Sequence, residues 1–276
     1  MKIYYYAHTG HKNGLDRLKK ATALLKKLNE KGLDTLLLVN DFRASLVARE
    51  FGIADSVHIE TVQDIDAIAE MGDVVIMDTP ENDRGRLEKY CREFKHVFRF
   101  AQDEADESRY GETMLSETII DDLYFEEHKK EDRTLFFLSD SDADKTILSN
   151  RNFFEDKGMD LLLGHYFYVK YESDLAKIFN NLHESEEYIE LICSSSHVVT
   201  ASFQTALEAR VAGAEVIYIS LGELNKQDKL QLESYKIKII DGFDSDNYNE
   251  ILSKGDSKVT IINKTDKTVQ RIINKL

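Results

Sequence analysis

The chain has 276 residues, of which 42% are hydrophobic and 32% charged, with 13 glycines and a single proline. This composition excludes collagen-like, low-complexity and generally disordered chains, and the length predicts one large α/β unit or two units of about 100–150 residues. The net charge of −15 argues against a general nucleic-acid or anionic-membrane binder, because an acidic surface repels phosphates.

The N-terminus and the cysteines predict the compartment. The opening residues lack the apolar core of a signal peptide, and no stretch reaches the roughly 18 consecutive apolar residues of a transmembrane helix. Cys91 and Cys193 lack the spacing of a metal site, so we interpret both as reduced core residues. We therefore expect a cytoplasmic protein without disulfides, transmembrane segment, metal or cofactor.

In the first half of the chain, short apolar runs alternate with amphipathic segments. Continuous apolar runs predict buried strands, and apolar residues spaced three and four apart predict helices. The expected strands are 2–7, 35–39, 57–60, 74–77 and 96–100. The expected helices are 15–31, 42–51, 62–71 and 84–94.

Charged runs at 102–109 and 126–133 interrupt this alternation and predict a domain junction. The alternation then restarts, with strands at 134–138, 159–163, 197–200, 216–220 and 237–240 and helices at 145–157, 187–193, 203–212, 226–235 and 268–276. We predict an α/β chain of two Rossmann-like, doubly wound parallel-sheet domains. They span 1–125 and 131–258, and residues 259–276 form a strand or helix that packs back on the first domain.

The loop between the first strand and the first helix is one candidate site. It contains five residues that could serve a ligand: His8, Gly10, His11, Asn13 and Gly14. Backbone N–H groups at a helix start favour an anion, and two imidazoles beside the carboxylate of Asp16 could move protons. The alternative is a surface turn in which Asp16 complements the helix dipole. Asp78, at the end of a strand, either faces the ligand or initiates a turn.

The second half offers two further groups. Ser202, Gln204 and Thr205 lie at a helix N-terminus, where they could bind phosphate, and Glu208 could accept hydrogen bonds from ribose. The alternative is an N-cap followed by an exposed glutamate. The run 139–142 (SDSD) follows the strand that opens this half. We favour a helix cap there, because a calcium loop needs a glycine and a downstream glutamate.

Three segments resemble a known family. Residues 198–213 (VVTASFQTALEARVAG) resemble its strand, small-residue turn, Thr, and Glu five residues before Gly, residues 74–78 resemble its strand ending in Asp, and residues 111–125 resemble its crossing segment. The chain is thus similar to the nucleotide-sugar hydrolases of the pseudaminic acid pathway, which share the GT-B fold of glycosyltransferases. The resemblance implies a UDP-sugar, with its nucleotide near Thr205 and Glu208.

The sequence also departs from that family. The family's first-loop histidine falls on Asp16 or Arg17, its tyrosine beyond the strand-end Asp on Pro80, and its glycine pair near the phosphate on Asp140 and Ser141. A carboxylate there would repel a diphosphate unless a cation intervenes. A histidine of the first loop could supply the missing base, with a carboxylate orienting it.

We therefore predict a GT-B-type enzyme that acts on a nucleotide-activated sugar, by hydrolysis or glycosyl transfer, in surface-polysaccharide or glycoconjugate biosynthesis. The alternative is a catalytically inert binding or assembly protein of the same fold, since the family histidine is lost. The catalytic candidates are His11, His8 and, as the orienting group, Asp16. The substrate-binding candidates are Gly10, Asn13, Gly14, Asp78, Ser139, Ser141, Ser202, Gln204, Thr205 and Glu208. The expected partner is a UDP-sugar, without nucleic acid, and a homodimer is an option.

Overall fold

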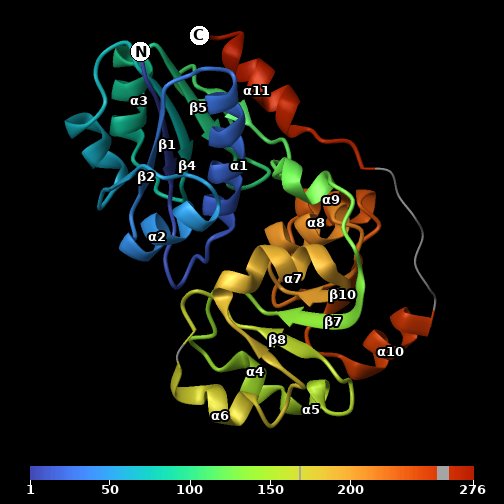
Figure 1. Ribbon diagram of the computed structural model, residues 1–276. Coiled ribbons are helices and arrows are strands. Elements are labelled where there is room, and N and C mark those ends of the chain that lie inside the picture. Colours follow the sequence, from blue (N-terminus) through green and yellow to red (C-terminus); the bar gives the residue numbers. More distant parts are fainter. Residues whose placement is uncertain (168, 254–260) are drawn as a thin grey trace. The chain divides into compact units, whose positions relative to one another are not determined.

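The computed structural model describes residues 1–167, 169–253 and 261–276 (Figure 1). Its contacts divide the chain into two compact units, each described by itself below. Unit 1 comprises Met1–Asp122 and Asn263–Leu276, and unit 2 comprises Leu123–Ile262. The boundaries expected from the sequence are at 125 and between 258 and 259, and the second falls outside the described residues.

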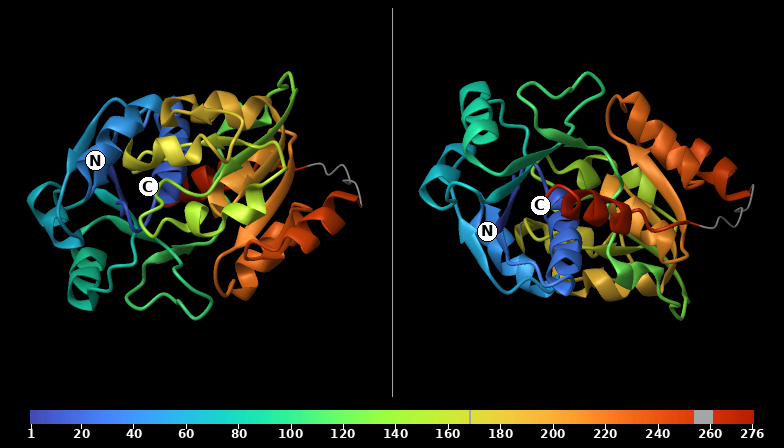
Figure 2. Two further views of the ribbon diagram at one scale, coloured as in Figure 1. Left: turned by 90° about the horizontal axis from the view of Figure 1, so that it is seen from below. Right: turned by 90° about the horizontal axis from the view of Figure 1, so that it is seen from above.

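Unit 1 is a six-stranded parallel sheet in the order β3-β2-β1-β4-β5-β6. The strands are β1 (Ile3–Ala7), β2 (Thr35–Val39), β3 (Ser56–His58), β4 (Val74–Asp78), β5 (His96–Phe100) and β6 (Thr113–Leu115). The helices are α1 (Asp16–Glu30), α2 (Phe42–Glu50), α3 (Arg84–Glu93) and α11 (Thr265–Ile273), and there is a 3-10 turn η1 (Val62–Ala67). A second 3-10 turn, η2 (Asp122–Phe125), contains the boundary between the two units in the chain. The C-terminal helix α11 packs beside α1 (Figures 1 and 2).

Unit 2 is a second six-stranded parallel sheet, in the order β12-β11-β10-β7-β8-β9. The strands are β7 (Glu131–Phe137), β8 (Asp160–Leu162), β9 (Leu182–His183), β10 (Ser195–Thr200), β11 (Glu215–Ser220) and β12 (Lys238–Asp241). The helices are α4 (Thr146–Ser149), α5 (Arg151–Phe154), α6 (Glu172–Leu175), α7 (Tyr188–Ser194), α8 (Phe203–Val211), α9 (Lys226–Ser234) and α10 (Ser245–Ser253), with 3-10 turns η3 (Val169–Tyr171) and η4 (Ser185–Glu187).

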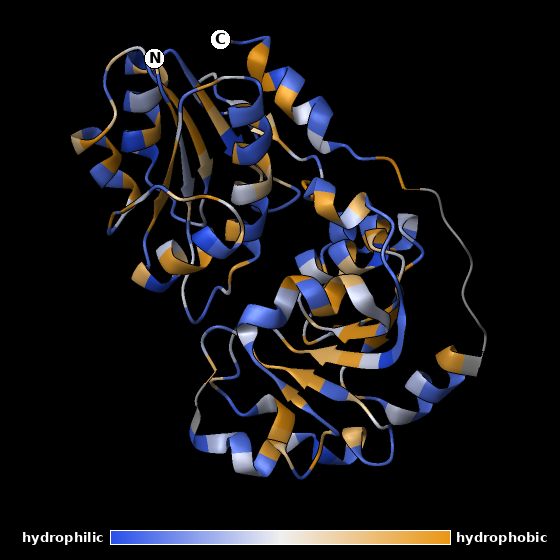
Figure 3. Cartoon of the chain, viewed as in Figure 1, coloured by the Kyte–Doolittle hydropathy of each residue, from blue (hydrophilic) through white to orange (hydrophobic). Residues whose placement is uncertain are grey.

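Both sheets have the same topology. Counted in chain order, the six strands of each unit lie 3-2-1-4-5-6, which is the Rossmann order. The central strands β1 and β4 are buried along their whole length, and Figure 3 shows the strands of unit 2 as mainly hydrophobic. Burial on both faces explains why the sequence shows continuous apolar runs. The predicted pair of doubly wound parallel sheets is confirmed.

Several elements differ from the sequence prediction. The edge strands β6 and β9 and the helix α10 were not predicted, and the segment predicted as a helix at 62–71 is the shorter 3-10 turn η1. The helix predicted at 145–157 is split into α4 and α5. Asn150 stands at the break, where its side-chain amide donates to the carbonyl of Thr146 at 2.8 Å and competes with the helical backbone bond. None of the helices built from described residues has the length and apolarity needed to span a bilayer.

Candidate functional site

The carboxyl edge of the sheet in unit 1 is the first candidate site. β1 and β4 pair in parallel at the centre of the sheet, with Ala7 opposite Asp78. The chain continues from β1 to β2 on one side and from β4 to β5 on the other. This reversal is the switch point at which doubly wound sheets bind ligands. His8, Asp78 and Glu81 all lie at this edge.

His8 is held by a carboxylate that follows the neighbouring strand. Its Nδ1 lies 2.9 Å from Glu81 Oε1, and the hydroxyl of Tyr6 donates to the same oxygen. Tyr6 and His8 are two residues apart, so an extended backbone directs both to one face of the sheet. The second oxygen of Glu81 accepts from the backbone N–H of Val62 at 2.8 Å. Three donors thus fix Glu81, and Glu81 fixes the imidazole ring.

These contacts indicate the charge of Glu81 and the position of the hydrogen on the His8 ring. Burial opposes ionisation of Glu81, but hydrogen bonds from His8, Tyr6 and the N–H of Val62 hold its pKa below the ordinary value. Burial and the hydrogen bond to Glu81 raise the pKa of Tyr6 well above its ordinary value, so Tyr6 remains a donor. Ionised Glu81 is then an acceptor, so the hydrogen on His8 Nδ1 faces Glu81, and the tautomer with this hydrogen has its lone pair on Nε2. A general base oriented by a carboxylate has this arrangement.

The rest of this loop turns back on itself before α1. The N–H groups of Asn13 and Gly14 both donate to the carbonyl of Gly10, at 2.9 and 2.8 Å. Gly10 and Gly14 have φ angles of 130° and 67°, which glycine adopts without the strain of a side chain. His11 lies at the exposed tip of this turn. The predicted binding roles of these residues stay predictions.

The orienting partner of the histidine corrects the sequence hypothesis. We expected Asp16 to orient a histidine of this loop, whereas the carboxylate on His8 comes from Glu81. Asp16 instead opens α1, with its Oδ1 3.7 Å from Lys19 Nζ. An acidic residue in the first turn complements the helix dipole, which is the structural alternative stated for Asp16.

Glu81 and Tyr6 are absent from the sequence prediction. Glu81 follows the end of β4, and β4 lies next to β1, so a carboxylate there meets the loop that carries His8. The signal available in the sequence was a carboxylate just beyond a buried strand. The spacing of Tyr6 at the end of β1 and His8 directly after it was a second, local signal.

Asp78 lies at the same edge on the other face of the sheet. Its side chain is 1% exposed, accepts from the Tyr5 hydroxyl at 3.3 Å, and pairs with Arg17 Nε at 3.3 Å and Lys20 Nζ at 2.7 Å. Its backbone carbonyl accepts from the N–H of His8 at 3.0 Å. Burial and the Asp78 charge raise the pKa of Tyr5 well above its ordinary value, so Tyr5 is the donor. Asp78 therefore anchors two cations of α1 next to β1, the strand that His8 follows.

The carboxyl ends of β7 and β10 form the corresponding edge of unit 2. Asp140, which follows β7, is 1% exposed, and its Oδ1 lies 3.1 Å from His165 Nδ1. A carboxylate at this position was expected to repel a diphosphate, but the structure buries it against a histidine. The hydroxyl of Ser139 donates to the carbonyl of Ser141 at 2.8 Å. The loop is therefore held by its own side chains.

Asp142, the last residue of this run, bonds the start of the next helix. Its carboxylate accepts from the N–H groups of Thr146 and Ile147 in the first turn of α4, the second at 3.2 Å. The N-cap of α4 is Lys145, so the N-cap predicted in 139–142 is wrong in position, although Asp142 bonds the first turn of the helix. Within the part of the chain that the structure describes, no group of three or more histidine, cysteine, aspartate or glutamate side chains could hold a metal ion.

Gly164 lets the ends of β7 and β8 approach closely. A Cβ at this position would lie 2.4 Å from the Cα and carbonyl carbon of Asp140 and from the carbonyl oxygen of Ser139. Gly164→Ala is therefore expected to lower the free energy of unfolding by about 1–3 kcal/mol, because backbone must move. Urea unfolding followed by circular dichroism measures this loss. Gly222→Ala is the control, since a Cβ there meets nothing within 4 Å, and an equal loss in both variants would contradict the packing argument.

The start of α8 holds a buried polar network. Ser202 is the N-cap, and its hydroxyl accepts from the N–H of Thr205 at 3.1 Å and donates to the Thr205 hydroxyl at 2.7 Å. Tyr188 of α7 bonds the Thr205 hydroxyl at 2.7 Å and donates to Glu208 Oε2 at 2.8 Å. Gln204 donates to Glu208 Oε1 at 2.8 Å. The four residues predicted to bind nucleotide are therefore neighbours, and Tyr188 joins them.

One assignment of hydrogens satisfies this network. Ser202 donates to Thr205, Thr205 to Tyr188, and Tyr188 to the carboxylate of Glu208. Burial and the Glu208 charge raise the pKa of Tyr188 well above its ordinary value, so its proton stays in place. The N-cap role of Ser202 is confirmed, but the alternative expected an exposed glutamate, and Glu208 is 2% exposed. Nucleotide binding by these residues stays a prediction.

Tyr188→Phe tests the energetic weight of the network. The variant removes the hydroxyl that bonds both Thr205 and Glu208 Oε2 in a buried network, so we expect a loss of about 1–3 kcal/mol in the free energy of unfolding. Urea unfolding measures the loss. Tyr248→Phe is the matched control, because the Tyr248 ring is buried and its hydroxyl makes no hydrogen bond within the described residues. Equal free energies of unfolding for Tyr188→Phe and Tyr248→Phe would show that the network does not contribute to stability.

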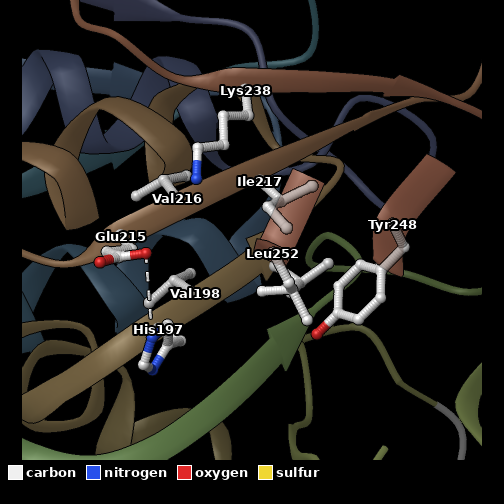
Figure 4. Close-up of a pocket in the computed structure, with 9 residues that line it drawn as sticks. His197, Val198, Glu215, Val216, Ile217, Lys238, Tyr248 and Leu252 are labelled. Atoms are coloured by element: carbon white, nitrogen blue, oxygen red, sulfur yellow. Dashed lines mark ion pairs between the residues drawn. The ribbon is translucent and has the colours of Figure 1, made fainter. Parts of the chain in front are cut away.

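Figure 4 shows a pocket of unit 2 at the opposite, amino ends of the strands. His197, Glu215 and Lys238 come from β10, β11 and β12, and Tyr248 and Leu252 come from α10. The interior volume is about 10 Å³, which is room for roughly one water molecule. We therefore do not assign a substrate to this pocket.

Comparison with known proteins supports the fold. No family model and no curated protein match the sequence. Among similar solved structures, the UDP-GlcNAc 2-epimerase of Methanocaldococcus jannaschii, in complex with UDP-GlcNAc and UDP, is 11% identical with a TM-score of 0.58 over 99% of each chain. The chain has the GT-B fold.

Two further structures have the same relation to the chain. S. aureus MnaA, in a co-structure with UDP, is 14% identical with a TM-score of 0.57, over 92% of this chain and 87% of that one. The glycosyltransferase SnogD of Streptomyces nogalater is 12% identical with a TM-score of 0.56, over 100% and 95%. These likenesses support the GT-B part of the resemblance, and the particular hydrolase family stays a prediction.

Proposed function

We propose that the chain is an enzyme that acts on a UDP-activated sugar, by hydrolysis or glycosyl transfer, in surface-polysaccharide or glycoconjugate biosynthesis. The observation that carries the proposal is His8, held by Glu81 at the switch point of unit 1 with its Nε2 lone pair available for a proton. The GT-B fold of structures solved with UDP supports the choice of ligand. A cytoplasmic location fits the two free cysteines, Cys91 and Cys193.

The proposed reaction needs one base. His8 Nε2 takes a proton from water or from an acceptor hydroxyl, whose oxygen forms a bond to the anomeric carbon. The bond from that carbon to the diphosphate oxygen breaks, and UDP leaves with the electron pair. Ionised Glu81 stabilises the imidazolium that forms, because it holds the Nδ1 hydrogen.

We assign nucleotide binding to unit 2. The candidates are Ser139, Ser141, Ser202, Gln204, Thr205 and Glu208. The burial of Asp140 against His165 supports the assignment, because the carboxylate that would repel a diphosphate is turned into the protein. The N-terminus of α8 offers backbone N–H groups to a phosphate.

Ligand binding and turnover test the proposal separately. Thermal-shift measurements on the full chain with UDP, CMP and ADP should give the largest stabilisation with UDP. Release of UDP from UDP-GlcNAc and UDP-glucose then measures turnover. A shift without turnover by either sugar nucleotide would favour the inert binding protein of the same fold. The absence of any shift with the three nucleotides would contradict both functions.

A further inference from the structure

Two cations in the first turns of α1 share a single carboxylate. Arg17 and Lys20 both pair with Asp78, at 3.3 and 2.7 Å, and each cationic side chain is 24% exposed while Asp78 is 1% exposed. One carboxylate neutralises one of the two charges. The cluster therefore presents a surplus positive charge at the ligand edge of unit 1, although the whole chain carries −15.

The guanidinium of Arg17 is fixed in direction. Its Nε pairs with Asp78, and its Nη2 donates to Gln102 Oε1 at 3.0 Å. Gln102 is itself held, because its amide donates to the carbonyl of Phe100 at 3.0 Å and its backbone N–H donates to Asp106 at 3.1 Å. A guanidinium has five N–H donors, so the contacts with Asp78 and Gln102 leave donors of Arg17 unused among the described residues. A preorganised fork of this kind suits a carboxylate or phosphate.

Lys20 is also held in place. Its Nζ lies 4.7 Å from the centre of the Phe100 ring, which covers one side of the ammonium, and Asp78 takes one of its three N–H donors. The other donors and the partly exposed head group remain for a ligand. Arg17 and Lys20 thus form a prearranged cation pair around a buried counter-charge.

We propose that Arg17 and Lys20 bind an oxyanion, a carboxylate or a phosphate, carried by the transferred sugar or by the acceptor. This inference rests on the proposed function and names the substrate class. The carbonyl of Asp78 accepts from the N–H of His8, so the cation pair and the base belong to one sheet edge. The oxyanion belongs to the sugar or the nucleophile rather than to the departing diphosphate, because the proposed function assigns the nucleotide to unit 2 and the cation pair lies in unit 1.

Matched pairs of compounds test the inference on the full chain. UDP-glucuronate and UDP-glucose differ in a carboxylate on the sugar. Glycerol 3-phosphate and glycerol, titrated in the presence of UDP, differ in a phosphate of the kind an acceptor carries. Calorimetric titration should show that, in one pair, the compound with the additional carboxylate or phosphate binds about 10–100-fold more tightly than the compound without it. The pair that shows the preference identifies the source of the oxyanion.

Three variants separate the cation pair from overall charge. Lys20→Met and Arg17→Gln should each reduce the preference about tenfold and leave the affinity for UDP unchanged. Each variant keeps one cation on Asp78, and circular dichroism checks the fold. Lys31→Met removes the same charge from the exposed end of α1 and should leave the preference intact.

The outcomes distinguish this inference from the proposed function. Equal affinities within both pairs, with UDP still bound, overturn the inference alone, and so does a preference that persists in both Arg17→Gln and Lys20→Met. Failure of UDP to bind overturns the proposed function. In that case D-glucuronate against D-glucose, titrated without nucleotide, decides whether the cation pair binds an oxyanion.

Discussion

His8→Ala is expected to lower the release of UDP from a UDP-sugar by about 10²–10⁴-fold, while the affinity for UDP stays the same. The physical reason is the loss of the Nε2 lone pair that takes the proton from the nucleophile. Glu81→Gln should show a smaller loss, because the amide can still accept a hydrogen bond from His8 but carries no charge to stabilise the imidazolium. Steady-state rates and UDP affinities of the purified variants measure both effects.

His11→Ala is the matched comparison for His8→Ala. Both histidines belong to the loop after β1, but His8 is held by Glu81 and His11 lies exposed at its tip. We expect His11→Ala to change the rate only a few-fold. A large loss for His11→Ala together with a normal rate for His8→Ala would return the base role to His11 and contradict the argument from Glu81.

The fold was predictable because its signals are local. Continuous apolar runs such as 35–39 and 74–78 mark strands that are buried on both faces, and the alternation with amphipathic helices implies a parallel sheet. The short edge strands β6 and β9 were missed because their segments contain no continuous apolar run of the kind that marks the central strands. The split between α4 and α5 was missed because it depends on a side-chain hydrogen bond of Asn150.

The site was less predictable because it depends on contacts between distant segments. His8 could be found from its place after the first strand, but its partner Glu81 is 73 residues away and meets it only because β4 pairs with β1. The direction in which a side chain points is equally hard to predict from the sequence. Asp140 in the sequence suggested repulsion of a phosphate, whereas the structure buries it against His165.

Arg99→Met is expected to lower the stability of unit 1 by about 3–5 kcal/mol at pH 7. Arg99 of β5 bonds to two buried carboxylates, Asp106 and Glu112, whose side chains are 6% and 0% exposed. Removing the guanidinium takes the cation from Glu112 and leaves Asp106 with the longer pair to Arg109 Nη2, at 3.5 Å. Asp106 also accepts from the backbone N–H of Gln102, and the side chain of Gln102 accepts from Arg17. The same change should therefore make the position of Arg17 in the cation pair of α1 less well defined. Urea unfolding, with hydrogen exchange of the β4 and β5 amides, measures the loss in unit 1.

The pH dependence gives this prediction its sharpest test. Burial opposes ionisation of Asp106 and Glu112, but hydrogen bonds from Arg99 and from backbone N–H groups hold both pKa values below ordinary ones. Groups with lowered pKa stabilise the fold above their ordinary values near 4 and lose that contribution as the pH falls through the native values. The wild-type protein loses the Arg99-dependent part of this stability on acidification, whereas Arg99→Met lacks it already at pH 7.

The difference between wild type and Arg99→Met should therefore be largest at neutral pH and shrink below about pH 4. Arg92→Met is the control, because the Arg92 side chain is 72% exposed and its ion pair with Glu93 is screened by solvent, so its loss should stay within about 0.5 kcal/mol. A difference for Arg99→Met that does not change with pH would assign the loss to packing rather than to the two carboxylates. A loss no larger than that of Arg92→Met would show that the buried charges are compensated without Arg99.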